Sequence, residues 1–358
     1  MKKKILISTG GSGGHVIPAI SFYEHLKENF DVSLVVDQRG NKFINKNKFK
    51  YTIIDSPRLS LNPLKLPLTL INLIIALFKS FFFLKKNRID ILLATGGYMS
   101  VPICLAAKIL KIKIYLFEPN AVIGRANNFL IKFCNKIFCY SEKIVNFPKK
   151  HINKIIIINH ILRKEIYAIN NFTKEKIDNC INLLILGGSQ GAQFFDNNIK
   201  NSIIKISKKF KIKVFHQISS ADLLNFELFY KEHNIVNKLF NFEENIFKYI
   251  SEANLVISRA GASTLSELAY LKVPFITIPF KHAKDDHQFE NAIYYEKKDC
   301  CWLIKEEEFN QNKLTTLLIS IIQNKEEYLR KKKAFEKFSY QNSWDKINEK
   351  ILEYINEN

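Results

Sequence analysis

Short runs of aliphatic and aromatic residues alternate along the chain with longer stretches in which apolar residues recur at helical spacing. The short runs of the first half predict strands at residues 4–8, 32–36, 89–94, 112–117 and 136–140. Those of the second half predict strands at residues 182–186, 213–217, 255–258 and 274–278. Because strands that alternate with helices form parallel sheets covered on both faces, the pattern predicts an α/β protein.

The two halves of the chain begin alike. In each, a predicted strand runs into a glycine-rich turn, residues 10–15 or 187–192, and then into a helical pattern. A strand, a glycine turn and a helix open a nucleotide-binding Rossmann-type domain, so their repetition predicts two such domains facing each other across a cleft. We place the first domain at residues 1–163 and the second at residues 164–340.

Three further segments lie outside these repeated units. A polar stretch near residues 163–178 is the expected linker, and residues 341–358 are predicted to form a helix that caps the second domain or crosses back to the first. Residues 64–84 are nearly apolar enough to span a membrane, but Pro67 and Lys79 interrupt them. We therefore expect an unusually apolar, partly exposed helix there and not a transmembrane span.

The positive net charge of the chain favours anionic partners but does not identify which one. Lys and Arg outnumber Asp and Glu by 54 to 34, for a formal net charge of +20, which favours nucleic acid, an acidic membrane or phosphorylated substrates. The basic residues are scattered, and no recognised nucleic-acid motif is present. The six cysteines lack metal-ligand spacing and sit mostly among apolar residues, which indicates buried, reduced thiols in a cytoplasmic protein.

The two glycine loops are candidate ligand sites. The first lets a ligand approach the backbone closely at a helix start and places His15 beside it, although a plain tight turn explains the same residues. The second adds the side chains of Ser189 and Gln190 to a helix N-terminus. That combination suits a diphosphate without a metal ion.

Three other polar positions follow predicted strands or open helices. Glu267 lies a turn or so into a helix rich in small residues, where a carboxylate accepts hydrogen bonds from a ribose diol or complements the helix dipole. Gln288 follows Asp285, Asp286 and His287, and its amide suits sugar hydroxyls better than this trio suits a metal. Glu118 ends a predicted strand, where it meets substrate or faces water.

Six ordered motifs resemble one family, the MurG family of peptidoglycan synthesis, which adds N-acetylglucosamine to lipid I to make lipid II. They are TGGSGGH (9–15), ATGGYMSVP (94–102), EPNAVIGRAN (118–127), LGGSQGA (186–192), SRAGASTLSE (258–267) and DDHQ (285–288) with Asn291 and Ala292. The resemblance implies the two-Rossmann GT-B glycosyltransferase architecture, which agrees with the duplication.

The resemblance also implies roles for individual residues. Ser189 and Gln190 would hold the donor diphosphate, Glu267 the uridine ribose and Gln288 the N-acetylglucosamine hydroxyls. The backbone of Ile246 would contact uracil. The other implied substrate-binding positions are Ser12, Gly13, Gly14, Asn120, Arg163, Ala262, Ser263, Thr264, Leu265 and Ser266. The Arg163 loop departs from the family pattern, because Asn159 lacks the glycine and proline that flank it in the family.

The implied reaction inverts the anomeric centre of UDP-N-acetylglucosamine with His15 or Glu118 as the general base, and it needs neither a metal ion nor another cofactor. The implied acceptor is lipid I. An apolar helix at residues 68–84, flanked by Lys65, Lys79, Lys85, Lys86 and Arg88, is then expected to bind an anionic membrane at the cytoplasmic face of the bacterial inner membrane, unless it is simply buried.

Contacts with other cell-wall synthesis proteins are also expected, and nucleic acid is not. Two alternatives stay open at the level of sequence. One is a GT-B transferase that acts on a different lipid acceptor. The other is a non-catalytic nucleic-acid-binding protein, which the net charge of +20 prompts.

Overall fold

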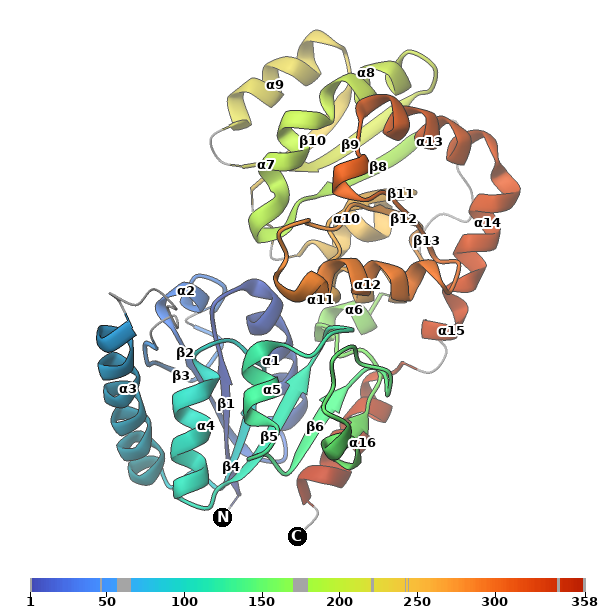
Figure 1. Cartoon of the computed structure of the whole chain (residues 1–358). Helices are drawn as coiled ribbons and strands as arrows, with labels where there is room; N and C mark the ends of the chain where they lie inside the picture. The colour runs from blue at the N-terminus through green and yellow to red at the C-terminus, as the bar shows by residue number, and fades with distance from the viewer. Residues whose placement is uncertain are drawn as a thin grey trace. The chain divides into compact units, whose positions relative to one another are not determined.

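The computed structural model describes residues 2–45, 47–56, 66–169, 180–219, 222–241, 243, 245–339 and 342–356, with the backbone alone at 66, 189–192 and 339. The chain forms two compact units, Met1–Lys164 with Ser343–Asn358, and Glu165–Asn342. Most of the expected linker, residues 170–178, lies outside the described residues. Each unit holds one parallel sheet with helices packed on it (Figure 1).

The N-terminal unit is built on a seven-stranded sheet of order β3-β2-β1-β4-β5-β6-β7. Its strands are β1 (Lys4–Thr9), β2 (Asp31–Val36), β3 (Tyr51–Ile53), β4 (Ile91–Ala94), β5 (Lys113–Glu118), β6 (Lys136–Cys139) and β7 (Ile155–Ile157). Its helices are α1 (Gly13–Leu26), α2 (Gln38–Asn41), α3 (Leu66–Asn87), α4 (Ser100–Ile109), α5 (Arg125–Leu130) and α16 (Trp344–Asn356), with a 3-10 turn at Lys149–Lys154.

The C-terminal unit is built on a six-stranded sheet of order β10-β9-β8-β11-β12-β13. Its strands are β8 (Ile181–Leu186), β9 (Ile212–Gln217), β10 (Val236–Phe240), β11 (Leu255–Ser258), β12 (Phe275–Thr277) and β13 (Cys301–Leu303). Its helices are α6 (Lys164–Tyr167, from the junction), α7 (Gly188–Asn198), α8 (Lys200–Ser207), α9 (Leu223–Glu232), α10 (Phe247–Glu252), α11 (Ala262–Tyr270), α12 (His287–Glu296), α13 (Gln311–Gln323), α14 (Lys325–Ala334) and α15 (Glu336–Ser339).

Alternate residues of each central strand face opposite helical layers, as the pleat of a strand requires. In the N-terminal sheet, Leu116 packs in the apolar core that includes Leu84 of α3 and Leu130 of α5. Its neighbour Phe117 lies on the other face, against Phe22 of α1 at a ring distance of 5.0 Å. All nine strands predicted from the hydrophobic runs are confirmed, and the α/β prediction is confirmed with them.

The final helix α16 packs on α1 and belongs to the N-terminal unit. Trp344 at its start stacks on His25 of α1 with ring centroids 3.6 Å apart. Tyr115 of β5 donates its hydroxyl hydrogen bond to the carbonyl of Tyr354 at 2.7 Å. The chain therefore leaves the N-terminal unit after Lys164 and returns to it at Ser343.

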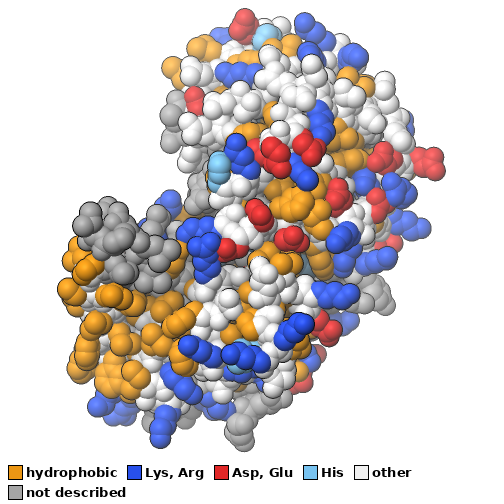
Figure 2. Space-filling view, viewed as in Figure 1, with side chains coloured by type: hydrophobic (Ala, Val, Ile, Leu, Met, Phe, Trp, Pro, Cys, Tyr) orange, Lys and Arg blue, Asp and Glu red, His pale blue; other side chains and the backbone are white. Residues whose placement is uncertain are grey.

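Helix α3 has its apolar side chains on the outside. Thr69, Ala76, Ser80 and Leu84 are buried on the side that packs along α4, and three of these residues are small. The outward face is apolar, with exposed fractions from 45% at Ile75 to 64% at Phe82, and Figure 2 shows hydrophobic side chains gathered over this helix. The outward apolar residues are Leu68, Leu70, Ile71, Ile74, Ile75, Phe78 and Phe82, which we call the α3 apolar face.

The partly exposed helix expected at residues 68–84 is thus confirmed, and the buried alternative is wrong. Pro67–Asn87 is long and apolar enough to cross a membrane, and about a fifth of it (22% of the tested stretch) is buried. The side chains of Lys79, Lys85 and Arg88 are exposed beside the apolar face, while Lys65 lies outside the described residues.

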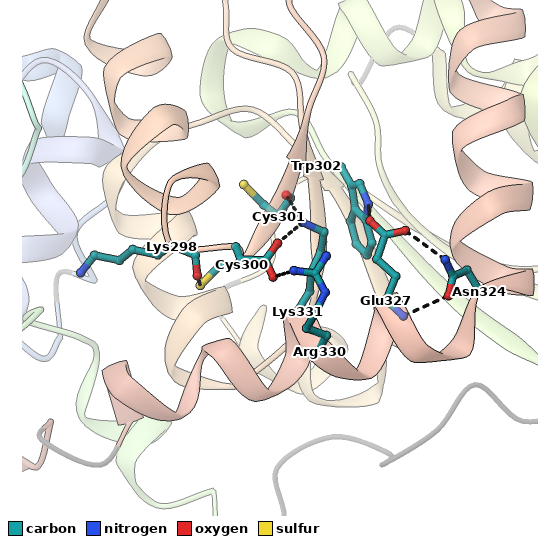
Figure 3. Close-up of polar contacts among 9 residues, drawn as sticks. Lys298, Cys300, Cys301, Trp302, Asn324, Glu327, Arg330 and Lys331 are labelled. Atoms are coloured by element: carbon teal, nitrogen blue, oxygen red, sulfur yellow. Dashed lines mark hydrogen bonds and ion pairs between the residues drawn. The ribbon is translucent and has the colours of Figure 1, made fainter.

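Strand β13, at one edge of the C-terminal sheet, is tied to α14 by side chains of both elements (Figure 3). Lys331 donates to Oδ1 of Asp299 at 2.8 Å and to the carbonyl of Cys301 at 3.0 Å, and the Nε1 of Trp302 donates to Glu327 at 2.9 Å. Of the six cysteines, all free, five are buried as expected, whereas Cys180 is only half-buried.

Candidate functional site

The first glycine loop follows β1 and is fastened to the end of β2. The N–H of Gly11 donates to Oδ1 of Asp37 at 2.8 Å, and the N–H of Gly40 donates to the same oxygen at 2.8 Å. A Cβ at Gly10 would come within 2.6 Å of that oxygen, so this position needs glycine. Ser12 stands at the N-cap position of α1 without a side-chain cap bond, and Gly13 and Gly14 begin the helix.

His15 lies in the first turn of α1 and is held by the loop after β4. Its Nδ1 lies 2.8 Å from the carbonyl oxygen of Thr95. Since a carbonyl only accepts, Nδ1 carries the proton of the neutral ring and Nε2 carries the lone pair. Gly96 adopts a left-handed φ of +97° and packs against the imidazole ring. A Cβ at this position would lie 3.0 Å from Cε1 of His15, so glycine at position 96 leaves room for the ring.

Glu118 organises the loop that follows β5. Its Oε1 accepts from the N–H and the Nδ2 of Asn120 at 3.1 and 2.9 Å. Its Oε2 accepts from the N–H of Gly124 at 2.7 Å and the Nδ2 of Asn127 at 2.9 Å. The carboxylate is buried, and these four donors match its four acceptor sites. The alternative of a loop carboxylate facing water is wrong.

The second glycine loop joins β8 to α7 and is fastened to the end of β9. The N–H of Gly188, which adopts a left-handed φ of +64°, donates to Oε1 of Gln217 at 2.9 Å. Ser189 and Gln190 lie in the first turn of α7, and their side chains are outside the described residues. Neither Asp37 nor Gln217 was predicted as a loop anchor.

Helix α11 opens at the end of β11, and Glu267 is buried in its second turn. Its role, as a ribose ligand or as a complement to the helix dipole, stays a prediction. Leu265 is fully buried and its N–H donates to the carbonyl of Gly261 at 3.0 Å, while Ser266 donates its hydroxyl to the carbonyl of Ala262 at 2.7 Å. The half-buried first-turn residues are Ala262, Ser263 and Thr264.

Gln288 and Asn291 of α12 hold the peptide groups around Ala260. Oε1 of Gln288 accepts from the N–H of Ala260 at 3.3 Å and from that of Phe280 at 3.0 Å. Asn291 donates to the Ala260 carbonyl at 3.1 Å. The side-chain oxygen of Gln288 is therefore engaged by two backbone amides, and its contact with a sugar stays a prediction.

The residues before α12 form a turn. Asp285 and Asp286 both adopt left-handed backbone angles, with φ of +56° and +51°. His287 places its Nδ1 2.7 Å from the carbonyl of Lys284. Among the described residues, no group of three or more His, Cys, Asp or Glu side chains is placed to hold a metal ion.

Arg259 is a buried residue of this region that the sequence patterns did not single out. Its guanidinium donates to Glu306 at 2.6 Å and to the carbonyl of Ile278 at 3.0 Å, and lies 4.2 Å from the ring centroid of Phe194. It therefore joins the ends of β11 and β12 to α7. Burial lowers its pKa, while Glu306 opposes that shift.

The loop before Arg163 is held without the family's glycine and proline. The hydroxyl of Tyr140 accepts from the N–H of Ile161 at 3.1 Å, and its ring lies 4.2 Å from that of His160. Arg163 is half-buried directly after this loop. Ile246 precedes α10, and its carbonyl already accepts from the N–H groups of Tyr249 and Ile250, both at 3.0 Å.

Both halves of the chain match glycosyltransferase family 28, the N-terminal domain model over residues 5–139 and the C-terminal domain model over residues 182–347. A Pelagibacter ubique protein is 50% identical over 358 residues, which is 100% of both chains. It is named UDP-N-acetylglucosamine–N-acetylmuramyl-(pentapeptide) pyrophosphoryl-undecaprenol N-acetylglucosamine transferase. The chain belongs to this transferase family. The family member of the same name from Rickettsia canadensis is 34% identical over 327 residues, 90% of this chain and 91% of its own.

Solved structures share the fold of this transferase family. The crystal structure of Acinetobacter baumannii MurG matches with a TM-score of 0.74 and 23% identity, covering 99% of each chain. Arabidopsis thaliana UGT89C1, complexed with UDP-L-rhamnose, matches with a TM-score of 0.70 and 14% identity, also over 99% of each chain. The predicted GT-B architecture is confirmed, and family membership makes the chain a glycosyltransferase and not a non-catalytic nucleic-acid-binding protein.

Proposed function

We propose that this chain transfers N-acetylglucosamine from UDP-N-acetylglucosamine to the muramyl 4-hydroxyl of undecaprenyl-pyrophosphoryl-MurNAc-pentapeptide (lipid I), giving lipid II. The observation that carries the proposal is the 50% identity, over the whole chain, with a transferase whose name states this donor and this acceptor. An α-linked donor becomes a β-1,4 linkage, so the anomeric carbon inverts in one displacement. The attacking hydroxyl needs a base, and the departing UDP needs its charge stabilised.

The donor's phosphates and ribose are assigned to the C-terminal unit. Helices α7 and α11 both begin at the carboxyl end of a strand of one sheet, where their N–H groups favour an anion. Ser189 and Gln190 bind the diphosphate at α7. The backbone of residues 262–266 lines phosphate and ribose, and the buried carboxylate of Glu267 accepts from the ribose hydroxyls.

The sugar and the base of the donor have separate contacts. The Nε2 of Gln288 donates to an N-acetylglucosamine hydroxyl, because its oxygen is engaged by two backbone amides. The uracil contact is assigned to the N–H of Ile246, because its carbonyl is engaged by the start of α10. Arg163 remains a candidate substrate contact after the Tyr140-supported loop.

The acceptor is assigned to the N-terminal unit, where Ser12, Gly13, Gly14 and Asn120 line the loops after β1 and β5. His15 is the general base in this proposal. Its bond to Thr95 fixes the tautomer in which Nε2 accepts a proton, and its place at the start of α1 disfavours positive charge on the ring. Glu118 shapes the acceptor loop, since all four of its hydrogen-bond sites serve that loop.

The α3 apolar face is proposed to rest on the cytoplasmic surface of the inner membrane, where the polyprenyl tail of lipid I is anchored. Exposed leucine, isoleucine and phenylalanine beside Lys79, Lys85, Lys86 and Arg88 combine apolar burial with attraction to anionic lipid. Because the other side of α3 packs along α4, the helix lies on the bilayer and does not cross it.

Ligand-dependent stability tests the donor assignment. UDP-N-acetylglucosamine at about one hundred times its dissociation constant should stabilise the protein by about 2.7 kcal/mol, and random DNA at moderate salt should not. Transfer should also persist in a chelator, because helix N-termini hold the diphosphate. Stabilisation by DNA alone, or activity that requires added magnesium or manganese, would contradict the corresponding part of the proposal.

A further inference from the structure

The glycine loops of the two units are fastened by the same device. In the N-terminal unit, the N–H of Gly11 donates to Asp37 at 2.8 Å, and Asp37 directly follows β2, the neighbour of β1. In the C-terminal unit, the N–H of Gly188 donates to Gln217 at 2.9 Å, and Gln217 ends β9, the neighbour of β8. In both units, a side chain at the carboxyl end of the neighbouring strand accepts a hydrogen bond from a glycine N–H of the loop.

The two fasteners differ in charge. Asp37 is buried, and its second oxygen accepts from the Nε of Arg39 at 2.7 Å, so a local cation balances the carboxylate. Gln217 supplies the same kind of oxygen from a neutral amide. No part of its role as an acceptor for Gly188 requires neutrality, because a carboxylate accepts an N–H at least as well.

The orientation of the Gln217 amide is set by its other end. Its Nε2 donates to the carbonyl of Asn241 at 3.2 Å, and the Nδ2 of Asn241 donates to the carbonyl of Ile218 at 3.0 Å. Gln217 also pairs in register with Phe240 of β10, just before the segment that leads to Ile246. One amide thus joins the loop after β8 to the loop after β10.

We infer that Gln217 is a positioning residue for the donor diphosphate, holding the Gly188 turn at the start of α7 with an acceptor that is neutral because the ligand is anionic. The inference rests on the proposed function, in which the diphosphate binds at that helix start. A carboxylate at this position would still accept from Gly188 but would add a negative charge next to the helix start that is assigned to the diphosphate. In the N-terminal unit, where the pyrophosphate of the acceptor is assigned, the carboxylate of Asp37 is balanced by Arg39.

Two substitutions test whether Gln217 positions the diphosphate site through a neutral acceptor or only makes a structural contact. Gln217→Glu keeps an oxygen for Gly188 and adds a negative charge, whereas Gln217→Met keeps the length of the side chain and removes both amide bonds. The matched control is Gln323→Glu, at an exposed residue that ends α13. Each full-length variant is titrated calorimetrically with UDP and with uridine, which lacks phosphate.

We expect Gln217→Glu to weaken UDP binding about 100-fold near neutral pH, equivalent to about 2.7 kcal/mol, while uridine binding changes less than about threefold. The loss should shrink as pH falls toward the usual carboxyl pKa of about 4.3, because a protonated carboxyl is neutral again. Gln217→Met should weaken UDP binding about tenfold, and raise the donor KM with little change in kcat at saturating donor. Gln323→Glu should match the parent.

Three results would overturn the inference. Gln217→Glu that binds UDP as the parent does would show that neutrality is irrelevant. Equal losses for UDP and uridine would reduce Gln217 to a structural contact of the whole nucleotide site. A parent chain that fails to bind UDP would overturn the proposed donor site together with this inference, whereas a parent that binds UDP beside unaffected variants would overturn the inference alone.

Discussion

At the scale of single residues, the two candidates for the general base differ in how their polar atoms are used. Glu118 accepts from four N–H groups of its own loop, and any proton it took up would displace one of them. His15 is fixed through Nδ1 by the Thr95 carbonyl, so its Nε2 has the lone pair that a base requires. The geometry favours His15 as the base and Glu118 as the residue that shapes the acceptor loop.

His15→Ala should lower kcat by about 100- to 10,000-fold with both substrates saturating, the usual range for a general base. The acidic limb of the kcat–pH profile should disappear in the variant, because the group that titrates there is gone. Glu118→Ala should act differently, by lowering the melting temperature and raising the acceptor KM. A His15→Ala variant within a few-fold of the parent, beside a large loss of kcat in Glu118→Ala, would reverse the assignment.

Glu267→Ala should weaken UDP binding more than it slows transfer at saturating donor. The buried carboxylate is proposed to accept from two ribose hydroxyls, and charge-assisted hydrogen bonds of this kind contribute about 1.5–3 kcal/mol each. Glu267→Gln, which keeps the size and one acceptor, serves as the matched variant and should lose less. A donor KM that stays at the parent value in Glu267→Ala would contradict the ribose contact.

The site could be predicted from sequence where its residues are neighbours in the chain, and less well where they are not. The glycine loops, His15 and Glu267 stood out because a strand, a turn and a helix follow one another directly. Asp37 and Gln217 lie 26 and 29 residues from the amides they hold, so only the pairing of adjacent strands reveals them. The two hydrogen bonds that the side-chain oxygen of Gln288 accepts, from the N–H groups of Ala260 and Phe280, likewise depend on tertiary contacts that the sequence does not reveal.

At the scale of elements, every strand that hydrophobic runs predicted lies inside a sheet, and every strand they missed lies at an edge. The four missed strands are β3, β7, β10 and β13, the outermost members of the two sheets. Edge strands are paired on one side and half-solvated, so short and mixed sequences suffice there, as in β10, where exposed and half-buried residues alternate before Phe240. Strand β7 is the exception, because its three residues are all isoleucine and it was still not predicted.

Helix α3 offers a matched test of membrane binding because its two sides differ. Phe78→Ser with Phe82→Ser should release the protein from vesicles of anionic phospholipid, since burying each phenylalanine contributes about 1.5–3 kcal/mol. Activity on a short-chain soluble acceptor should survive. Phe81 packs partly against the core and is unsuitable for this test.

The control on the buried side of α3 is Leu84→Ser. Leu84 is fully buried in the N-terminal core, so its loss should destabilise the protein by about 2–5 kcal/mol. Vesicle binding by the double variant at the parent level, with an unchanged melting temperature, would show that the α3 apolar face is not the membrane contact. Unfolding of the double variant would contradict the outward placement of these rings.

At the scale of the whole molecule, two buried histidines make stability depend on pH. Burial lowers the pKa of His25 and of His216 to about 3, with repulsion from Lys164 and Lys200 respectively as the smaller cause. The unfolded chain takes up these protons near pH 6.5 and the folded protein does not. Stability is therefore complete above about pH 6.5 and is lost as pH falls from there toward 3, at about 1.4 kcal/mol per pH unit for each histidine.

His25→Phe keeps a ring against Trp344 and removes the titrating group. Its unfolding free energy should fall less steeply between pH 6.5 and 4.5 than that of the parent, by about 1.4 kcal/mol per pH unit. Urea unfolding followed by Trp344 fluorescence in a Trp302→Phe background reports on the N-terminal unit alone, since the chain has two tryptophans. Parallel slopes for variant and parent would contradict the neutral, buried state of His25.

The duplication of a Rossmann-like unit was predictable because each unit opens with the same local sequence of strand, glycine turn and helix. The return of residues 343–358 to the N-terminal unit could not be predicted. The sequence left open whether this helix caps the second domain or crosses back to the first. The contacts that decide it, Trp344 on His25 and Tyr115 with Tyr354, join residues more than 200 positions apart. Local patterns carry no information about pairings of that length.

Transfer of labelled N-acetylglucosamine from UDP-N-acetylglucosamine to lipid I, with the linkage of the product determined, tests the central claim most directly. The account predicts labelled lipid II with a β-1,4 linkage, equimolar release of UDP, and loss of the reaction in His15→Ala at both saturating substrates. Transfer to a different lipid while lipid I stays unlabelled would contradict the proposed acceptor. Labelled lipid II with the α configuration retained would contradict the single displacement on which the roles of His15 and the two helix N-termini depend.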